Sequence, residues 1–468
     1  MKYSLLNIVF LCFLLCAVKV THAINKAEPG QTTYNMHKGI NISTWIVYTS
    51  ASDGSEVADY FTKSHFDELI RLGFNHFRLP FSEKILYKSI SPIVRDTVSF
   101  RLVHNFIGWC QEAGVTVALN YHIPRVAKST IGGDNATGVA ERNKIVNVWN
   151  DLSLAFGHYP NETLAYEIFN EPNFSSNTIW NSFANSMISK IREREQERII
   201  ILGPNGNNDI SKLPYLSLPA DKKNLVVSVH FYAPSALSHY NVGGLKGIFV
   251  RLNYPGQIFT TEALAELTQQ ERDQIQPHSG NFTVETQKTR LQPLLDFATT
   301  NNVRIRCGEY GANNEYEKAY NDKDIKVRYF QDVVQVFDEL NIPHCLWGYK
   351  SSFGIFNDAD ELNDPRVVQA ITGYDITTVA NNVGNSLKLK VYPLPAKANQ
   401  TVTIEADFEQ EILQHAVVEM YNLSGIGISS VVLTNPITRI VMPDKQGVYI
   451  ISVKSKHEVI KSLRLVVM

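Results

Sequence analysis

The feature that most constrains the fold is an alternation of short apolar runs with amphipathic segments between residue 39 and about residue 350. The runs are dense in Val, Ile, Leu, Phe or Tyr, and most are nearly continuous in apolar residues. This is typical of strands covered on both faces, and therefore of a parallel sheet. The eight predicted strands span 39–44, 76–81, 115–122, 164–170, 198–204, 225–232, 304–309 and 344–349.

Helical patterns lie between these strands. Segment 64–73 begins with a candidate N-cap, Ser64, has apolar residues at helical spacing, and ends at Gly73. Similar patterns span 97–113, 140–156, 178–194, 285–300 and 326–340. Eight strands alternating with helices predict an α/β fold, the (β/α)8 or TIM barrel. The alternative is an open doubly wound sheet, which usually has fewer strands and a phosphate-binding turn that this sequence lacks.

The sequence pattern changes after about Thr377. A polar, turn-rich linker at 377–389 precedes short alternating runs, which predict a small all-β sandwich at 390–468. The runs span 387–392, 401–406, 416–421, 439–442, 447–454 and 461–467. We therefore predict a barrel domain at 24–376 followed by this second domain.

The N-terminus predicts export. Residues 1–23 combine a basic start, an apolar run from Leu5 to Val18 and small residues near Ala23, as in a secretory signal peptide. A membrane anchor is the alternative, but the apolar run is short for a bilayer span. Lipid attachment at Cys16 is disfavoured because Leu14 and Leu15 are bulky where that processing requires small residues. We expect no transmembrane segment in the mature chain, which is secreted or attached to the cell surface.

Charge and cysteine content exclude several partners. The formal net charge of the 468 residues is −2, and Lys and Arg form no long run, so a nucleic-acid partner is not expected. Cys110, Cys307 and Cys345 remain after removal of the signal, an odd number, and a core of this size does not need disulfides. No Cys or His pair has metal-ligand spacing, and we expect no metal, no cofactor and a monomeric chain.

Two carboxylates follow predicted strands. Pro172 must end the strand that begins at Leu164, because proline cannot donate to a sheet ladder, and we expect Asn170 and Glu171 to be exposed there. The run 304–311 presents Glu309 in the same way. Barrel enzymes carry their chemistry at the carboxyl ends of the strands. Two carboxyls at this rim suggest acid/base or nucleophilic chemistry on an acetal.

The barrel resembles glycoside hydrolase family 5 from about Gly39 to Gly373. The resemblance rests on motif residues in order at successive strand ends: Arg78, His122, Asn170-Glu171-Pro172, His230, Tyr232, Glu309 and Trp347. Asn120 departs from the pattern, since relatives often carry an acid there. The segment after Trp347 also differs from common cellulases, which leaves the subsite preference open.

The resemblance implies a role for each residue. Glu171 would be the general acid/base and Glu309 the nucleophile, with Tyr232 orienting Glu309 and His230 supporting Glu171. Asn170 and His122 would contact sugar hydroxyls, and Trp347 would form the floor under the −1 sugar. Trp45 is a weaker candidate for stacking on substrate.

Physical chemistry adds three expectations. A general acid requires a raised pKa at Glu171, whereas a nucleophile requires Glu309 to stay ionised, as a neighbouring Arg78 would ensure. A retaining mechanism predicts carboxyl groups ~5–5.5 Å apart. The long connection 233–284 carries several aromatic side chains, which either contact sugar or pack the loop onto the barrel.

The last ~80 residues, a size that suits a small domain, resemble the sorting domain of the type IX secretion system of Bacteroidetes. The match is carried by 391–396, 418–425, 446–451 and the terminal 461–467, with Leu394 in place of the usual asparagine. The resemblance implies the type IX secretion machinery as a partner. A carbohydrate-binding sandwich is the alternative, but it would need a planar row of exposed aromatics, and this segment is poor in them.

These features together predict a secreted retaining endo-β-1,4-glucanase of the cellulase type, acting on a β-glucan polysaccharide. A β-mannanase, a xyloglucanase and a β-1,3-glucan hydrolase remain open within the same mechanism. A non-catalytic glycan-binding protein is the alternative from another class, although it would not need both Glu171 and Glu309.

Overall fold

The computed structural model describes residues 32–48, 55–374, 388–393, 396–407, 415–422, 427–433, 435–455 and 458–467. The chain divides into two compact units, 1–374 and 375–468. The predicted signal peptide and most of the predicted linker lie outside the described residues. None of the helices in the described residues is long and apolar enough to span a bilayer.

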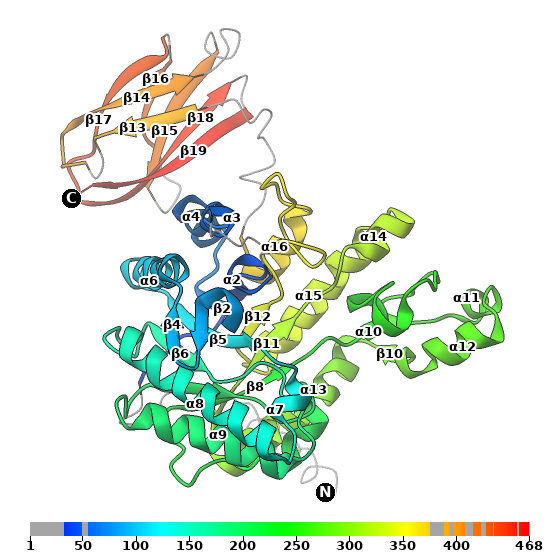
Figure 1. The fold of residues 1–468 in the computed structure, drawn as a ribbon. Helices are drawn as coiled ribbons and strands as arrows, with labels where there is room; N and C mark the ends of the chain where they lie inside the picture. The colour runs from blue at the N-terminus through cyan, green and yellow to red at the C-terminus, as the bar shows by residue number, and fades with distance from the viewer. Residues whose placement is uncertain are drawn as a thin grey trace, which may run out of the picture. The chain divides into compact units, whose positions relative to one another are not determined.

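The first unit is a closed barrel of eight parallel strands in the order β1-β12-β11-β8-β7-β6-β5-β2 (Figure 1). Gly39 of β1 closes it by pairing with both His76 and Cys345. A Cβ at Gly39 would lie 2.8 Å from the His76 ring, so only glycine fits between the two neighbouring strands. The strands are β1 (Gly39–Asn41), β2 (His76–Ser82), β5 (Thr116–Ile123), β6 (Leu164–Glu167), β7 (Ile199–Leu202), β8 (Leu225–His230), β11 (Arg304–Tyr310) and β12 (His344–Leu346).

All eight predicted strands are present, and most pair over a shorter stretch than predicted. β6, for example, ends at Glu167 and not at Asn170, although the N–H groups of Ile168 and Asn170 still donate to the carbonyls of Ile201 and Tyr121. The helices that surround the strands are α4 (Lys63–Arg71), α6 (Thr97–Glu112), α8 (Ala136–Phe156), α9 (Asn177–Arg192), α13 (Val284–Asn301) and α15 (Asp324–Glu339) (Figure 1). Helix α4 starts one residue before Ser64, with Thr62 as its N-cap.

Shorter elements lie between the main strands and helices of the barrel and were not predicted. They are α2 (Trp45–Tyr48), α3 (Ser55–Tyr60), α5 (Glu83–Leu86), the hairpin β3 (Tyr87–Ile90) and β4 (Ile93–Arg95), α7 (Lys128–Ile131), η1 (Ile210–Tyr215), α14 (Glu315–Tyr320) and α16 (Pro365–Thr372). Most lie in loops that follow the carboxyl ends of strands, where they shape the rim that carries the site.

The connection between β8 and α13 folds into a small subdomain, residues 233–283, which we call the insertion. It contains α10 (Ser235–Ser238), η2 (Gly243–Leu245), α11 (Thr261–Ala265), α12 (Gln269–Ile275), η3 (Gln276–His278) and a ribbon of β9 (Gly256–Gln257) and β10 (Asn281–Phe282). Tyr240 and Phe259 are buried in it, whereas Phe249 is 58% exposed. Of the two predicted roles for these aromatic residues, Tyr240 and Phe259 have the packing role.

One sequence prediction about the barrel core is wrong. Trp45 is fully buried against Phe61 and Phe106, and its indole N–H donates to the carbonyl of Val57 at 2.6 Å. It is a core residue and cannot stack on substrate. Cys110, Cys307 and Cys345 are buried free thiols in this structure.

The second unit consists of two antiparallel sheets, β13-β14-β17 and β16-β15-β18-β19. The two sheets share one hydrophobic cluster, which includes Ile404, Met420 and Ile451, so the unit is the predicted small all-β domain. Its strands are β13 (Lys388–Tyr392), β14 (Thr401–Asp407), β15 (Ala416–Asn422), β16 (Gly427–Val432), β17 (Ile437–Val441), β18 (Gly447–Ser455) and β19 (Glu458–Val467). Strand β16 was not predicted, because its glycine and two serines have low strand propensity and it lies at a sheet edge.

Candidate active site

Arg78 of β2 organises the centre of the barrel mouth. The guanidinium is fully buried and bonds Glu309 (2.6 Å), Asn41 (2.8 Å), Asn170 (2.7 Å) and both oxygens of Glu167 (2.7 and 3.0 Å). Because a guanidinium has five N–H donors, these five bonds use all of them. Arg78 therefore fixes one carboxylate from β11 and one amide from the loop after β6.

A register shift in β11 lies directly before Glu309. The pairing of β11 with β8 shifts register between Cys307 and Glu309, at Gly308. A Cβ on Gly308 would lie 2.4 Å from the hydroxyl of Ser228, so only glycine allows this close approach between β11 and β8. The second oxygen of Glu309 accepts a hydrogen bond from the hydroxyl of Tyr232 at 2.9 Å. Both carboxylate oxygens are thus held in place.

Glu171 lies in the loop after β6 with a left-handed backbone, φ 47°. Its Oε1 is 2.8 Å from Nδ1 of His230, whose Nε2 is 3.2 Å from the side-chain amide nitrogen of Asn208. Since the amide donates to Nε2, Nδ1 carries the proton and donates to Glu171. The predicted contacts of His230 with Glu171 and of Tyr232 with Glu309 are both present.

The pKa of Glu171 and the burial of Asn170 both differ from what the sequence predicted. Burial acts to raise the pKa of Glu171, but the hydrogen bond from His230 and the positive charges of Lys128 and Arg78 lower that pKa below its ordinary value. The expected raised pKa is therefore not present in this unliganded site. Asn170 is buried and not exposed, because its amide oxygen is bonded to Arg78. The Glu171 side chain is 33% exposed.

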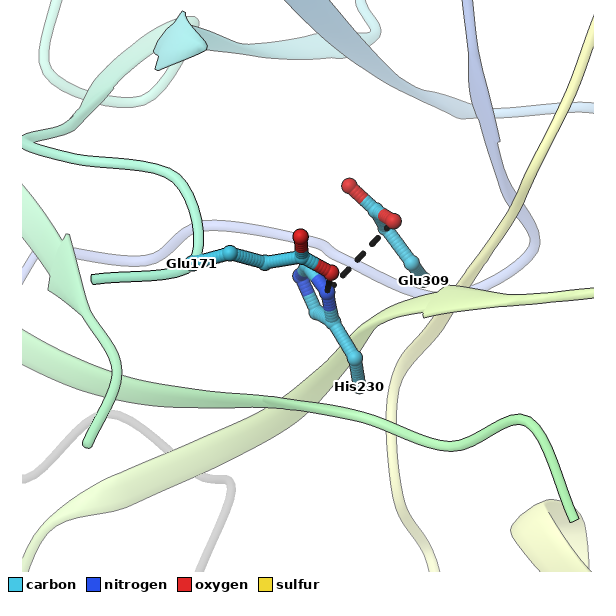
Figure 2. A group of neighbouring side chains, drawn as sticks. All are labelled: Glu171, His230 and Glu309. Carbon is cyan, nitrogen blue, oxygen red and sulfur yellow. Dashed lines mark hydrogen bonds and ion pairs between the residues drawn. The ribbon is translucent and has the colours of Figure 1, made fainter. Parts of the chain in front are cut away.

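Glu171, His230 and Glu309 converge in one cluster (Figure 2). One carboxylate oxygen of each glutamate and one ring nitrogen of the histidine lie within 4.8 Å of one another. Such a set of two oxygens and a nitrogen could ligate a cation. The charge of Arg78, 2.6 Å from Glu309, disfavours a second positive charge there. The absence of a metal site stays a prediction.

Aromatic and imidazole rings line the other side of the mouth. His122 stacks parallel on Trp347, with ring centroids 5.2 Å apart. Asn120 Oδ1 accepts from His122 Nδ1 at 2.8 Å, and His122 Nε2 lies 3.4 Å from the hydroxyl of Tyr48. Burial and the charges of Arg78 and Lys128 hold the pKa of His122 well below its ordinary value, so this ring is neutral. Trp347 is partly exposed, as a sugar-stacking floor requires.

Two cavities meet at Glu171. One of about 620 Å³ extends toward the loop after β7 and the insertion, with Asp209, Tyr232 and His278 in its wall. The other, of about 370 Å³, lies beside Tyr48, His122 and Asn170. Open space on both sides of the same carboxylate is what a chain-cleaving site needs.

Several residues of the site were not predicted from the sequence. Glu167 is buried between Arg78 and Arg306, and its pKa is about 2: burial acts to raise it, and the charges of the two arginines outweigh that effect. A charged residue within an apolar strand run was the available signal, both for Glu167 and for Arg306. Asn41, Tyr48 and Lys128 gave no comparable signal, because polar residues next to strands are common.

Comparison with known proteins decides the family. Residues 33–352 match the family model described as cellulase (glycosyl hydrolase family 5). The chain belongs to glycosyl hydrolase family 5. The family 5 match includes every predicted site residue, and it establishes a glycoside hydrolase of the endoglucanase-like kind.

The individual relatives are distant but match over nearly their whole length. Endoglucanase C of Acetivibrio thermocellus is 22% identical over 332 residues, which are 68% of this chain and 93% of the relative. The crystal structure of the cellulose synthase subunit Z of Clostridioides difficile matches with a TM-score of 0.58 at 21% identity, covering 72% of this chain and 99% of that one. A hyperthermophilic endo-β-1,4-glucanase solved with substrate matches with a TM-score of 0.57 at 21% identity, over 76% and 99% of the two chains. The structural matches establish the barrel fold.

Proposed function

We propose that this family 5 enzyme is a secreted, retaining endo-β-1,4-glucanase that uses Glu309 as nucleophile and Glu171 as acid/base. The observation that carries the proposal is the convergence of the two carboxylates, with oxygen atoms within 4.8 Å of each other across one barrel mouth. Retaining enzymes hold their carboxyl groups ~5–5.5 Å apart, whereas inverting enzymes need ~6.5–9.5 Å to admit a water. The short separation favours double displacement.

In the first step, Glu309 attacks the anomeric carbon while Glu171 donates its proton to the leaving oxygen. The bond between carbon and leaving oxygen breaks as the ester bond to Glu309 forms. Arg78 and Tyr232 each hold one oxygen of Glu309, which fixes the orientation of the carboxylate for attack.

In the second step, Glu171 removes a proton from water, which attacks the same carbon and releases Glu309. Ester formation removes the negative charge of Glu309, so it no longer opposes ionisation of Glu171. His230, 2.8 Å from Glu171, stabilises the carboxylate form that the second step requires. Asn170, held by Arg78, and His122 would bond the sugar hydroxyls.

The polymer and the internal mode of cleavage are supported by two observations. Relatives across two thirds of the chain carry the name endoglucanase. The two cavities that meet at Glu171 leave room for sugar units on both sides of the scissile bond. A pocket closed on one side would instead favour removal of terminal units.

Substitution of the two glutamates tests the assignment. Glu309→Gln removes the nucleophile and is expected to abolish turnover, and it leaves Glu167 paired with Arg78, so the fold persists. Glu171→Ala is expected to lower kcat on unactivated glucans by about 10²–10⁴-fold. It should have a smaller effect on aryl glycosides whose leaving group needs no proton. Circular dichroism checks the fold, and full activity in either variant would contradict the assignment.

The substrate is tested by measuring reducing-sugar release on a panel of soluble β-1,4-glucan, mixed-linkage glucan, β-1,3-glucan, mannan and xyloglucan. We expect the highest kcat/KM on a β-1,4-linked glucan, with Glu171→Ala as the inactive control. Preference for mannan, xyloglucan or β-1,3-glucan would reassign the substrate within the family. Binding without release from any polysaccharide would support the glycan-binding alternative.

Export and sorting form a separate part of the proposal. The N-terminal 23 residues would direct export, and the all-β unit at 390–468 would engage type IX secretion machinery, as its motifs and small size suggest. Deletion of 385–468 in a host with this system should move enzyme activity from the medium or cell surface into the cell. Unchanged extracellular delivery would refute the sorting role.

A further inference from the structure

Lys128, the first residue of α7, reaches the loop that carries Glu171. Its Nζ donates to the backbone carbonyl of Glu171 at 3.0 Å. Its stem is half-buried and its ammonium lies 6.0 Å from the centre of the Phe169 ring. Lys128 also lines the smaller of the two cavities, together with Glu171 and Asn170.

The backbone that Lys128 holds is an unfavourable one. Glu171 has φ 47°, a left-handed conformation that costs a non-glycine residue roughly 1–3 kcal/mol unless its surroundings hold it. Pro172 follows and has no N–H, so the loop cannot be secured through that donor. A charged donor on the carbonyl of Glu171 is a direct means of keeping the residue in this conformation.

The groups that face Glu171 come from several elements. Arg78 of β2 and His230 of β8 act on it electrostatically, and Glu309 of β11 lies in the same cluster, 2.6 Å from Arg78 and 3.4 Å from His230. The hydroxyls of Tyr48 and Tyr232 and the ring of His239 are also within electrostatic reach. Arg78 is already paired with Glu167 and Glu309. Lys128 pairs with no carboxylate among the described residues, so its charge acts on the Glu171 loop.

We propose that Lys128 is a positioning residue for the acid/base Glu171, which it holds by its backbone carbonyl and biases toward the carboxylate by its charge. This inference rests on the proposed function, since it concerns the same proton transfer. Nothing in it requires Lys128 to touch the substrate.

The test compares Lys128→Met, Lys128→Arg and wild type. Methionine keeps an unbranched apolar stem but removes the donor and the charge, whereas arginine keeps both. Lys190→Met, which removes a surface partner of Glu193, is the matched control. Lys128→Met should lower kcat on a soluble β-glucan roughly tenfold, the scale of one charged hydrogen bond. Lys128→Arg should restore most of the rate.

The pH profile separates positioning from a merely structural effect. Positive charge lowers the pKa of Glu171, so its removal raises that pKa. Glu171 must be protonated in the first step, and activity falls as the pH rises through its pKa. The alkaline limb of kcat/KM for Lys128→Met should therefore move to higher pH. An unmoved limb, or equal losses on glucans and on activated aryl glycosides, would overturn the inference.

A measurement that needs no turnover keeps the inference independent of the proposed activity. The side-chain carboxyl of Glu171 is titrated by 13C NMR in wild type and in Lys128→Met, with the signal assigned by Glu171→Gln. We expect the midpoint of the Glu171 titration curve to move to higher pH in Lys128→Met and to stay unchanged in Lys190→Met. Coincident curves would refute the role of Lys128. An inactive wild type with shifted curves would refute only the proposed function.

Discussion

At the scale of single residues, the site depends on two buried arginines that share carboxylates. Arg78 and Arg306 both contact Glu167, and Arg78 also contacts Glu309, so two positive charges face two negative ones inside the barrel. Each buried charge would be costly alone and is tolerable because each has partners. Glu167 therefore holds the arginine that holds Glu309, the proposed nucleophile.

Glu167→Gln should destabilise the barrel, because it leaves both arginines short of a charge partner. We expect a loss of about 3–5 kcal/mol in the free energy of unfolding, measured by urea titration near neutral pH. Glu405, on β14 of the second unit, supplies a control, Glu405→Gln, which should change the unfolding of the barrel little. Equal stability of Glu167→Gln and wild type would contradict this role.

The difference in unfolding free energy between wild type and Glu167→Gln should depend on pH in a definite direction. The pKa of Glu167 is lowered to about 2, so this carboxylate stabilises the fold at pH values above its ordinary 4.5. That contribution, about 3 kcal/mol, is lost as the pH falls toward 2. The stability difference between wild type and Glu167→Gln should therefore narrow between pH 4.5 and pH 2. A difference that widened in acid would contradict the assigned direction.

At the scale of elements, the sequence predicted the strands and helices that carry strong hydrophobic patterns. Apolar runs such as 225–232 predict strands of a parallel sheet. Parallel strands bring their carboxyl ends to one edge, and this predicted that Glu171 and Glu309 lie together. The conformation of the loops could not be predicted from hydrophobic patterns. The burial of Asn170 and of Trp45 depends on contacts with residues distant in sequence, Arg78 and Phe106, which no local pattern encodes.

In the insertion too, the sequence pattern alone could not predict which side chains are buried. Its aromatic residues looked equally suited to sugar and to packing, yet Tyr240 bonds both backbone groups of Val250 and lies against Tyr316, while Phe249 is exposed. Its helices are four to seven residues long, too short to leave a periodic signal.

Tyr240→Ala is expected to cost about 3–5 kcal/mol in unfolding free energy, because it removes a buried ring and leaves Val250 without its partners. Limited proteolysis should cut the insertion faster in this variant. Phe249→Ala, in the same segment, should behave as wild type in both measurements. If the two variants were equally stable, the insertion would not be packed as described.

At the scale of the whole molecule, one unit carries the chemistry and another follows it in sequence. The barrel, its family and its two glutamates could be predicted because motif residues recur at successive strand ends. The lowered pKa of Glu171 could not be predicted from the sequence, because His230, Lys128 and Arg78 lower it together. The boundary predicted near residue 376 lies close to the division of the chain at 374 and 375.

The central claim is that Glu309 and Glu171 act on one anomeric carbon by double displacement. The most direct measurement is 1H NMR of the first products released from a soluble β-1,4-glucan, recorded before mutarotation mixes the anomers. The account predicts that the new reducing end appears first as the β-anomer, since two displacements retain configuration. Initial appearance of the α-anomer would mean a single displacement by water and would contradict it.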